Sequence, residues 1–126
     1  MTMKRILTVL AAVVCLCGCE KFFTPSSITM SSAGETVTVQ TIIFPDTMYI
    51  LNYDGEGVHS PEYDEETETF TVTYEWLTAS IAKSSFNGEG REMTLTAEKN
   101  TTGKRRTLYV GGMHGDLQSS MKVTQQ

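Results

Sequence analysis

Cysteine and histidine are scarce in this chain, and their scarcity excludes several classes of enzyme. The three cysteines all lie within the first 19 residues, so the remainder holds no disulfide and no cysteine-based metal or redox site. The two histidines are His59 and His114, and no Gly-x-Ser-x-Gly motif accompanies them. We expect both to lie in exposed loops. We therefore predict that the protein is not an enzyme and that it holds no metal or cofactor.

Positive charge is also scarce. The chain has 10 Lys and Arg against 15 Asp and Glu, a formal net charge of −5. Its basic run, Lys104–Arg106, is too short to neutralise a nucleic-acid backbone, so we expect no nucleic-acid partner. The excess of carboxylates favours solubility and repels anionic lipid.

Long apolar runs are missing as well, since a bilayer-spanning helix takes about 20 apolar residues. The N-terminal apolar run Ile6–Leu16 has eleven residues and follows the basic pair Lys4-Arg5, which is the order of a secretory signal peptide. Cys19 then stands directly after Leu16-Cys17-Gly18, and this arrangement resembles the bacterial lipobox. The resemblance implies cleavage before Cys19 and acylation of its thiol.

This reading divides the chain into three parts. We predict a signal peptide over residues 1–18, a lipidated tether over 19–27 and one domain over 28–126. Two basic residues leave with the signal peptide, so eight Lys and Arg remain against fifteen Asp and Glu, and the net charge becomes −7. Two or more acyl chains hold a protein stably on a membrane. We therefore expect an envelope protein anchored in the outer membrane, with the face of that membrane left open.

The predicted tether contains Pro25 and two serines, and it lacks a periodic apolar pattern. Phe22 and Phe23 leave its course open. These two side chains lie either in the membrane interface beside the lipid or against the domain, and the sequence does not decide between the alternatives.

The predicted domain alternates apolar and polar residues with a period of two and has no helical periodicity. Thr, Val and aromatic residues dominate these runs, which is typical of half-buried strands. The predicted strands are Ile28–Met30, Val37–Ile43, Tyr49–Tyr53, Phe70–Trp76, Met93–Ala97, Leu108–Val110 and Met121–Val123. Turn-forming residues, Gly111-Gly112 among them, stand between the runs. We therefore predict an all-β fold, an immunoglobulin-like β-sandwich of about six to seven strands.

Several short motifs follow one another along the domain. Ala33-Gly34-Glu35 opens a strand, Trp76-Leu77 ends a later one, Asn100 and Arg106 follow, and Val123-Thr124-Gln125 stands near the C-terminus. This order resembles the BACON domain, the Bacteroidetes-associated carbohydrate-binding often N-terminal module. The resemblance implies an immunoglobulin-like sandwich on an exported protein. The family name implies sugar binding, without a fixed set of contact residues, and family members also serve as spacers beside catalytic domains.

The residues that carry this resemblance have structural interpretations. We expect Trp76 in the core, because it is in phase with the apolar residues before it. Asn100 suits a turn conformation that most residues avoid. We expect Arg106 to lay its stem over the sheet edge and to pair with a carboxylate. The chain departs from the family pattern between Phe44 and Phe70, where it lacks a tryptophan and has an acidic segment instead.

The acidic segment, residues 54–68, has three interpretations. Its carboxylates are Asp54, Glu56, Asp64, Glu65, Glu66 and Glu68. Clustered carboxylates bind calcium, although the Asp-x-Asp-x-Asp-Gly order of a known calcium loop is missing. A glycosidase needs two carboxyl groups held across a sugar, and nothing rigid is implied here. We expect a solvated loop and leave calcium open.

Exposed aromatic rings are the remaining candidates for a binding surface, because sugars stack their apolar faces on such rings. The candidate glycan contacts are Tyr49, Tyr53, Tyr63 and Tyr109. Tyr109 is out of phase with its apolar neighbours, so we expect it to face solvent. The first functional hypothesis is a non-catalytic, lipid-anchored protein that binds glycans. The alternative is a structural or assembly subunit that docks an envelope protein through an edge strand or the 54–68 loop.

Overall fold

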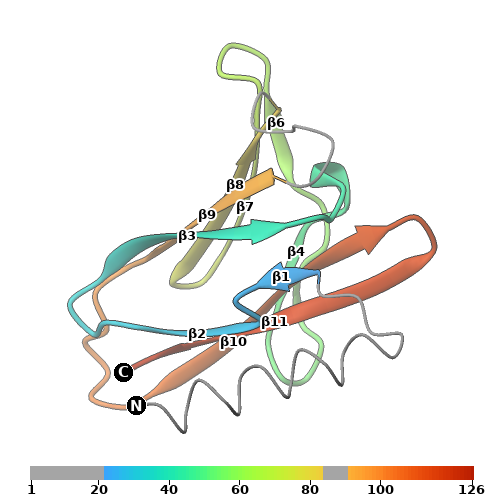
Figure 1. Ribbon diagram of the computed structural model, residues 1–126. Helices are drawn as coiled ribbons and strands as arrows, with labels where there is room; N and C mark the ends of the chain where they lie inside the picture. Colours follow the sequence, from blue (N-terminus) through green and yellow to red (C-terminus); the bar gives the residue numbers. More distant parts are fainter. Residues whose placement is uncertain (1–21, 84–90) are drawn as a thin grey trace, which may run out of the picture.

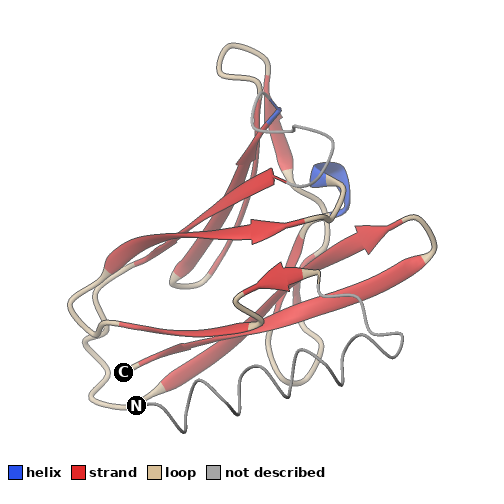
Figure 2. Cartoon of the chain, viewed as in Figure 1, coloured by secondary structure: helices blue, strands red, loops and turns tan. Residues whose placement is uncertain are grey.

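The computed structural model describes residues 22–83 and 91–126 (Figure 1). The predicted signal peptide and the predicted lipid attachment site at Cys19 lie outside these residues. In the described part of the chain two β-sheets pack face to face and no α-helix occurs, so the prediction of a β-sandwich is confirmed (Figure 2). None of the helical segments described is long and apolar enough to cross a membrane.

The two sheets contain six and five strands. In spatial order the six-stranded sheet consists of β1 (Phe23–Thr24), β3 (Glu35–Thr41), β9 (Arg91–Ala97), β8 (Leu77–Ala82), β7 (Thr69–Tyr74) and β6 (Glu62–Asp64). The five-stranded sheet consists of β2 (Ser27–Met30), β11 (Leu117–Gln125), β10 (Arg106–His114), β4 (Tyr49–Leu51) and β5 (Gly57–Val58). A 3-10 turn, η1 (Pro45–Thr47), lies between β3 and β4.

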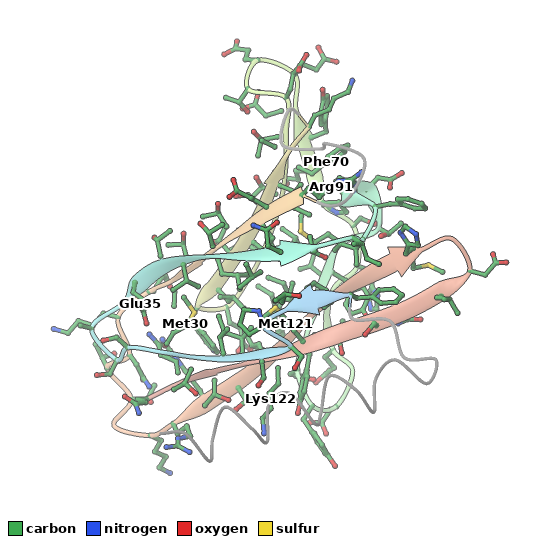
Figure 3. The ribbon with its side chains drawn as sticks, in the orientation of Figure 1. Met30, Glu35, Phe70, Arg91, Met121 and Lys122 are labelled. Atoms are coloured by element: carbon green, nitrogen blue, oxygen red, sulfur yellow. The ribbon has the colours of Figure 1, made fainter. Side chains whose placement is uncertain are left out.

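Alternation along each long strand places every second side chain between the sheets. In β9 the odd-numbered residues from 91 to 97 are buried, and the even-numbered ones are more exposed. Met30 and Met121 of the five-stranded sheet lie in the space between the sheets, whereas Lys122 points away from it (Figure 3). One continuous apolar layer therefore joins the two sheets, and its burial is the main stabilising contribution.

The prediction of a strand over Phe70–Trp76 is wrong at its C-terminal end, and the strand that follows it, β8, was not predicted. β7 ends at Tyr74, which pairs with Leu77 across the two-residue turn Glu75-Trp76, where Glu75 has a φ of 53°. The turn shifts the inward phase by one residue, so that β8 buries Leu77, Ala79 and Ile81. Trp76 lies in this turn, and it is buried as predicted, with 5% of its surface exposed.

The count of about six to seven strands is too low, because the described residues contain eleven. Part of the difference lies in the acidic segment 54–68, which is not a plain solvated loop. It contains β5, which pairs with β4, and β6, which pairs with β7. Strands of two or three residues are too short to show an alternating pattern in the sequence.

The N-terminal part of the described chain belongs to both sheets. β1 pairs with the end of β3 in the six-stranded sheet, and after the cis bond Thr24-Pro25 the chain crosses to the other sheet, where β2 runs parallel to β11. Phe22 and Phe23 are 7% and 3% exposed and belong to the core. Of the two alternatives for these rings, the structure has the one in which they pack on the domain. The sandwich thus includes residues 22–27, which the sequence analysis assigned to the tether.

The residues that carry the BACON resemblance gather at one end of the sandwich. The Arg106 guanidinium lies 4.9 Å from the centroid of the Trp76 ring, and its Nε donates to Oε1 of Gln125 at 2.8 Å. Gln125 is fully buried, and its Nε2 donates to the carbonyls of Ser31 and Glu98. The predicted carboxylate partner of Arg106 is therefore replaced by an aromatic face, an amide oxygen and, at 3.4 Å, two backbone carbonyls.

Asn100 belongs to the same end but acts through its side chain. Its Nδ2 donates to the carbonyls of Lys104 and Gln126, and its Oδ1 accepts hydrogen bonds from Thr102. The left-handed conformation expected at Asn100 is found instead at Gly103, with a φ of 77°. Asn100 thereby holds the β9–β10 turn together and joins it to the C-terminus.

Candidate functional site

The four candidate tyrosines lie on three separate surfaces. Tyr49 and Tyr109 belong to the outer face of the five-stranded sheet. The residue that follows each of them, Ile50 or Val110, is buried on the inner face. Tyr109 is half-buried, with Leu51 and Lys122 as its strand partners. It lies on the solvent-facing side of the sheet, as its phase predicts, but its side chain is only partly exposed.

Tyr49 is 8% exposed, so it presents little surface to a ligand. Its ring lies over Gly111, whose missing side chain leaves the room for it. The hydroxyl accepts a hydrogen bond from Nε2 of Gln118 at 3.0 Å and lies 3.5 Å from the carbonyl of Ser119. These contacts explain the burial, and Tyr49 is left out of the candidate site.

Tyr53 is the most exposed of the four, with 87% of its surface accessible. It lies in the turn between β4 and β5. The Asn52 side chain holds this turn, because its Oδ1 accepts hydrogen bonds from the backbone N–H groups of Asp54 and Glu56. Over residues 22–83 and 91–126, no second aromatic ring packs against Tyr53, so this tyrosine offers a single exposed ring.

Tyr63 lies beside a second aromatic ring. On β6 it stands directly opposite Phe70 of β7, and the two rings pack with centroids 4.6 Å apart and planes inclined by 43°. Phe70 has the inward phase of β7, which it shares with buried Val72. β6 projects away from the five-stranded sheet (Figure 1), and the Tyr63 ring stays 42% exposed. An aromatic pair is therefore accessible at this edge.

This pair forms one wall of a pocket of about 430 Å³. The pocket is lined by Pro45, Tyr63, Phe70, Lys83 and Arg91, and we call it the aromatic pocket. Figure 3 shows Phe70 and Arg91 together at this end of the sandwich. Among the described residues, the lining combines two aromatic faces with two cationic side chains, and none of these described lining residues is a carboxylate or a histidine.

Arg91 is the buried cation of the aromatic pocket, 7% exposed. Its Nη1 donates to the carbonyl of Ile43 at 2.9 Å, which fixes the guanidinium. Burial lowers the pKa of Arg91 from its usual value, and the nearby Asp46 carboxylate opposes this shift. An arginine remains protonated at neutral pH, so the pocket keeps a positive charge beside the two rings.

The acidic segment provides no obvious metal site. Asp64 uses Oδ1 to accept hydrogen bonds from the backbone of Glu66 and Thr67, which shapes the β6–β7 turn. Within residues 22–83 and 91–126, no three Asp, Glu, His or Cys side chains lie close enough together to hold an ion.

The Tyr74 phenol lies near the acidic segment. Its pKa is raised by partial burial and then by the Glu75 carboxylate.

Both histidines are exposed, as predicted. His59 lies in the loop between β5 and β6, and its ring centroid is 6.1 Å from that of Tyr49. His114 is the last residue of β10 rather than a loop residue, and its Nδ1 lies 2.8 Å from the carbonyl of Ile42, to which it donates. Neither histidine lines the aromatic pocket.

Sequence reasoning found Tyr63 but overlooked the rest of the pocket. Phe70 is predicted only as the first residue of a strand, and Pro45, Lys83 and Arg91 carry no motif. One signal was available, because the acidic run of residues 64–68 lies between Tyr63 and Phe70. Interpreting that run as a hairpin turn pairs the two rings across it.

Comparison with known proteins gives one partial structural likeness. A Bacteroides ovatus GH5 xyloglucanase, solved in complex with a XXXG heptasaccharide, matches 80% of this chain with 18% sequence identity and a TM-score of 0.48. The match covers 17% of the xyloglucanase chain. No family model and no curated protein matches the sequence. A likeness at this level carries no inference about ligand or activity.

Proposed function

We propose that this protein is a non-catalytic, lipid-anchored component of a bacterial cell envelope, built on a BACON-type sandwich, and that it binds a glycan in the aromatic pocket. The observation that carries the binding proposal is the accessible Tyr63–Phe70 pair beside the buried cation of Arg91. Sugars stack their C–H faces on aromatic rings and direct their hydroxyl groups to fixed donors. The pocket supplies both kinds of contact.

The size and charge of the pocket suit a short stretch of a glycan. Its volume of about 430 Å³ lies within the usual range of small-molecule sites. Arg91 and Lys83 favour a sugar that carries a carboxylate, because charge-assisted hydrogen bonds are stronger than neutral ones. The expected ligand class is therefore an oligosaccharide, with uronate-containing ones binding more tightly than neutral ones.

Membrane attachment is supported by the order of residues at the N-terminus. A basic pair, an apolar run and a small residue before Cys19 match the layout of a lipoprotein signal. Two or more acyl chains at Cys19 give stable attachment to the membrane without any spanning helix. We propose the outer membrane as the site.

Docking of a protein by strand addition is less well supported at this edge. β6 has three exposed residues, and two of them, Glu62 and Asp64, carry negative charge. Short and charged edge strands are the features by which proteins avoid unwanted strand pairing. The glycan hypothesis is therefore preferred over the assembly subunit for the surface around residues 54–68.

A binding experiment on the soluble chain of residues 20–126 tests the glycan proposal. This fragment omits Cys19 but keeps Phe22 and Phe23, which the core requires. It is titrated with neutral and uronate-containing oligosaccharides, the XXXG heptasaccharide included. We expect a dissociation constant of about 1 mM or tighter for at least one of them. We also expect Tyr63→Ala to weaken that binding by about tenfold, because it removes the stacking face.

Tyr53→Ala is the matched control, since it removes a tyrosine of the same region that is fully outside the pocket. It should leave the dissociation constant unchanged. The binding proposal fails if no oligosaccharide is retained in the millimolar range, or if Tyr63→Ala and Tyr53→Ala have the same effect.

A further inference from the structure

The distance between the predicted lipid and the folded domain is very short. Two residues, Glu20 and Lys21, separate Cys19 from Phe22, and Phe22 is already buried in the sandwich. Three Cα–Cα steps span at most about 11 Å, even when fully extended. If Cys19 carries acyl chains, the part of the domain around Phe22 is held within that distance of the membrane surface.

The surface around Phe22 consists of residues from three parts of the chain. The Phe22 ring meets the His114 ring edge to face, with centroids 6.3 Å apart, and the centroid of the Phe44 ring lies 5.1 Å from that of the same imidazole. His114 is fixed there by its hydrogen bond to the Ile42 carbonyl. Leu117 is the strand partner of His114 across the β10–β11 turn. We call Phe22, Phe44, His114 and Leu117 the anchor end.

Two large apolar side chains of the anchor end are open to solvent. Phe44 is 40% exposed and Leu117 is 56% exposed. They make up two of the four exposed large hydrophobic residues of the described chain, and the other two are Tyr53 and Tyr63. Of these four large residues, the two without a polar side-chain atom thus lie at the end where the predicted lipid would be attached.

We propose that the anchor end lies against the membrane, with the side chains of Phe44 and Leu117 in contact with lipid. This inference rests on the acylation of Cys19 in the proposed function. The acyl chains supply the affinity, and the two side chains set the orientation, because tethering brings them to the interface at no further translational cost. The sandwich then stands with its opposite end, the turn of residues 31–34, directed away from the bilayer.

The charges at the anchor end define the kind of membrane surface. Asp46 follows Phe44 by two residues, and Asp116 directly precedes Leu117. Both carboxylates are exposed and repel anionic headgroups. The matching partner is therefore a zwitterionic lipid surface rather than a strongly anionic one.

The aromatic pocket borders the anchor end, because Pro45 of the pocket follows Phe44 directly. In this orientation a glycan bound in the pocket lies close to the membrane surface.

Depth-dependent quenching on the acylated full-length product tests this orientation. After processing, acylation occupies Cys19 and the other two cysteines are removed, so one introduced cysteine is the single labelling site. Asp116→Cys carries an NBD fluorophore at the anchor end, next to Leu117, and leaves both Phe44 and Leu117 in place. The matched control is Ala33→Cys, an exposed position in the turn that precedes β3 at the opposite end. Both proteins are reconstituted in phosphatidylcholine vesicles that contain a nitroxide-labelled lipid.

We expect both labelled proteins to co-float with the vesicles, and quenching at residue 116 to exceed that at residue 33 by about threefold. Equal quenching at the two positions, in a protein that co-floats, overturns the orientation but leaves the anchoring intact. Failure to co-float refutes acylation, and the inference falls with it. Self-quenching that depends on protein density, and not on the nitroxide lipid, identifies a second copy of the chain as the occupant of the anchor end and also overturns the proposal.

Discussion

Single buried polar residues decide how the ends of the strands are joined in this sandwich. Gln125 connects Arg106 of β10, the Ser31 turn and the end of β9 through three hydrogen bonds, while it is itself fully buried. Removing such a side chain leaves donors and acceptors without partners in a place that water does not reach, and each such group costs about 1–3 kcal/mol.

Replacing Gln125 with alanine tests this network. We expect Gln125→Ala to lower the free energy of unfolding by about 2–4 kcal/mol, because two carbonyls and the Arg106 Nε lose their partner. Urea denaturation followed by circular dichroism measures the change. Gln126→Ala, next along the chain and exposed, is the control and should change stability by less than about 0.5 kcal/mol. Similar effects of the two substitutions would contradict the role assigned to Gln125.

The sequence allowed the burial of Trp76 to be predicted but not the partners of Arg106 and Asn100. The burial of Trp76 was predicted from its phase with the apolar residues before it, although Trp76 lies in the turn that follows β7. Arg106 and Asn100 bind groups that lie 19 and 26 residues away in the chain, at Gln125 and Gln126. Local pattern identifies a polar residue that needs a partner, but the partner is fixed only when distant strands pair.

Strands β10 and β11 form the longest pair of the sandwich, and two glycines lie within it. The sequence predicted a turn at Gly111-Gly112, whereas both residues lie inside β10 (Arg106–His114). The Tyr49 ring covers Gly111 on the outer face, and Ile43 approaches Gly112 on the inner face. A glycine in the sequence can mark a turn, or a place in a strand where a neighbouring group approaches closely. The alternation of apolar and polar residues does not distinguish the two cases.

A methyl group at Gly111 tests this packing. The added Cβ would overlap the Tyr49 ring and approach the Ser119 carbonyl to 2.6 Å. We therefore expect Gly111→Ala to lower the free energy of unfolding by about 1–3 kcal/mol, measured by urea denaturation. The control is Ser120→Ala, the exposed strand partner of Gly111 on β11, which should be close to neutral. A neutral Gly111→Ala would show that Tyr49 does not need the space.

At the level of the whole molecule, the sequence predicts the two-sheet architecture but not which residues come together at its edges. Period-two alternation in the long strands predicts two packed sheets, because a half-buried strand must cover its apolar face. It does not predict that β1 joins the six-stranded sheet while β2, directly after it, joins the five-stranded one. Nor does it predict that Tyr63 and Phe70 pair across an acidic turn. Both depend on strands of two to four residues, which show too few alternations to be recognised.

The proposed arrangement of the whole domain relative to a membrane follows from its first strand. Because Phe22 and Phe23 belong to the core, the predicted lipid has almost no free chain between it and the sandwich. A domain held this closely cannot sample the space around it as a domain on a long linker does. The orientation at the anchor end and the position of the aromatic pocket both depend on that short connection.

The most direct test of this account is the intact mass of the mature protein, extracted with detergent from the membranes of the bacterium that makes it. We expect a chain that begins at Cys19 and carries the added mass of at least two acyl chains. We also expect Cys19→Ala to abolish that mass and to release the protein from the membrane fraction. A mature chain that begins at another residue, or one whose Cys19 thiol is free, would contradict the account.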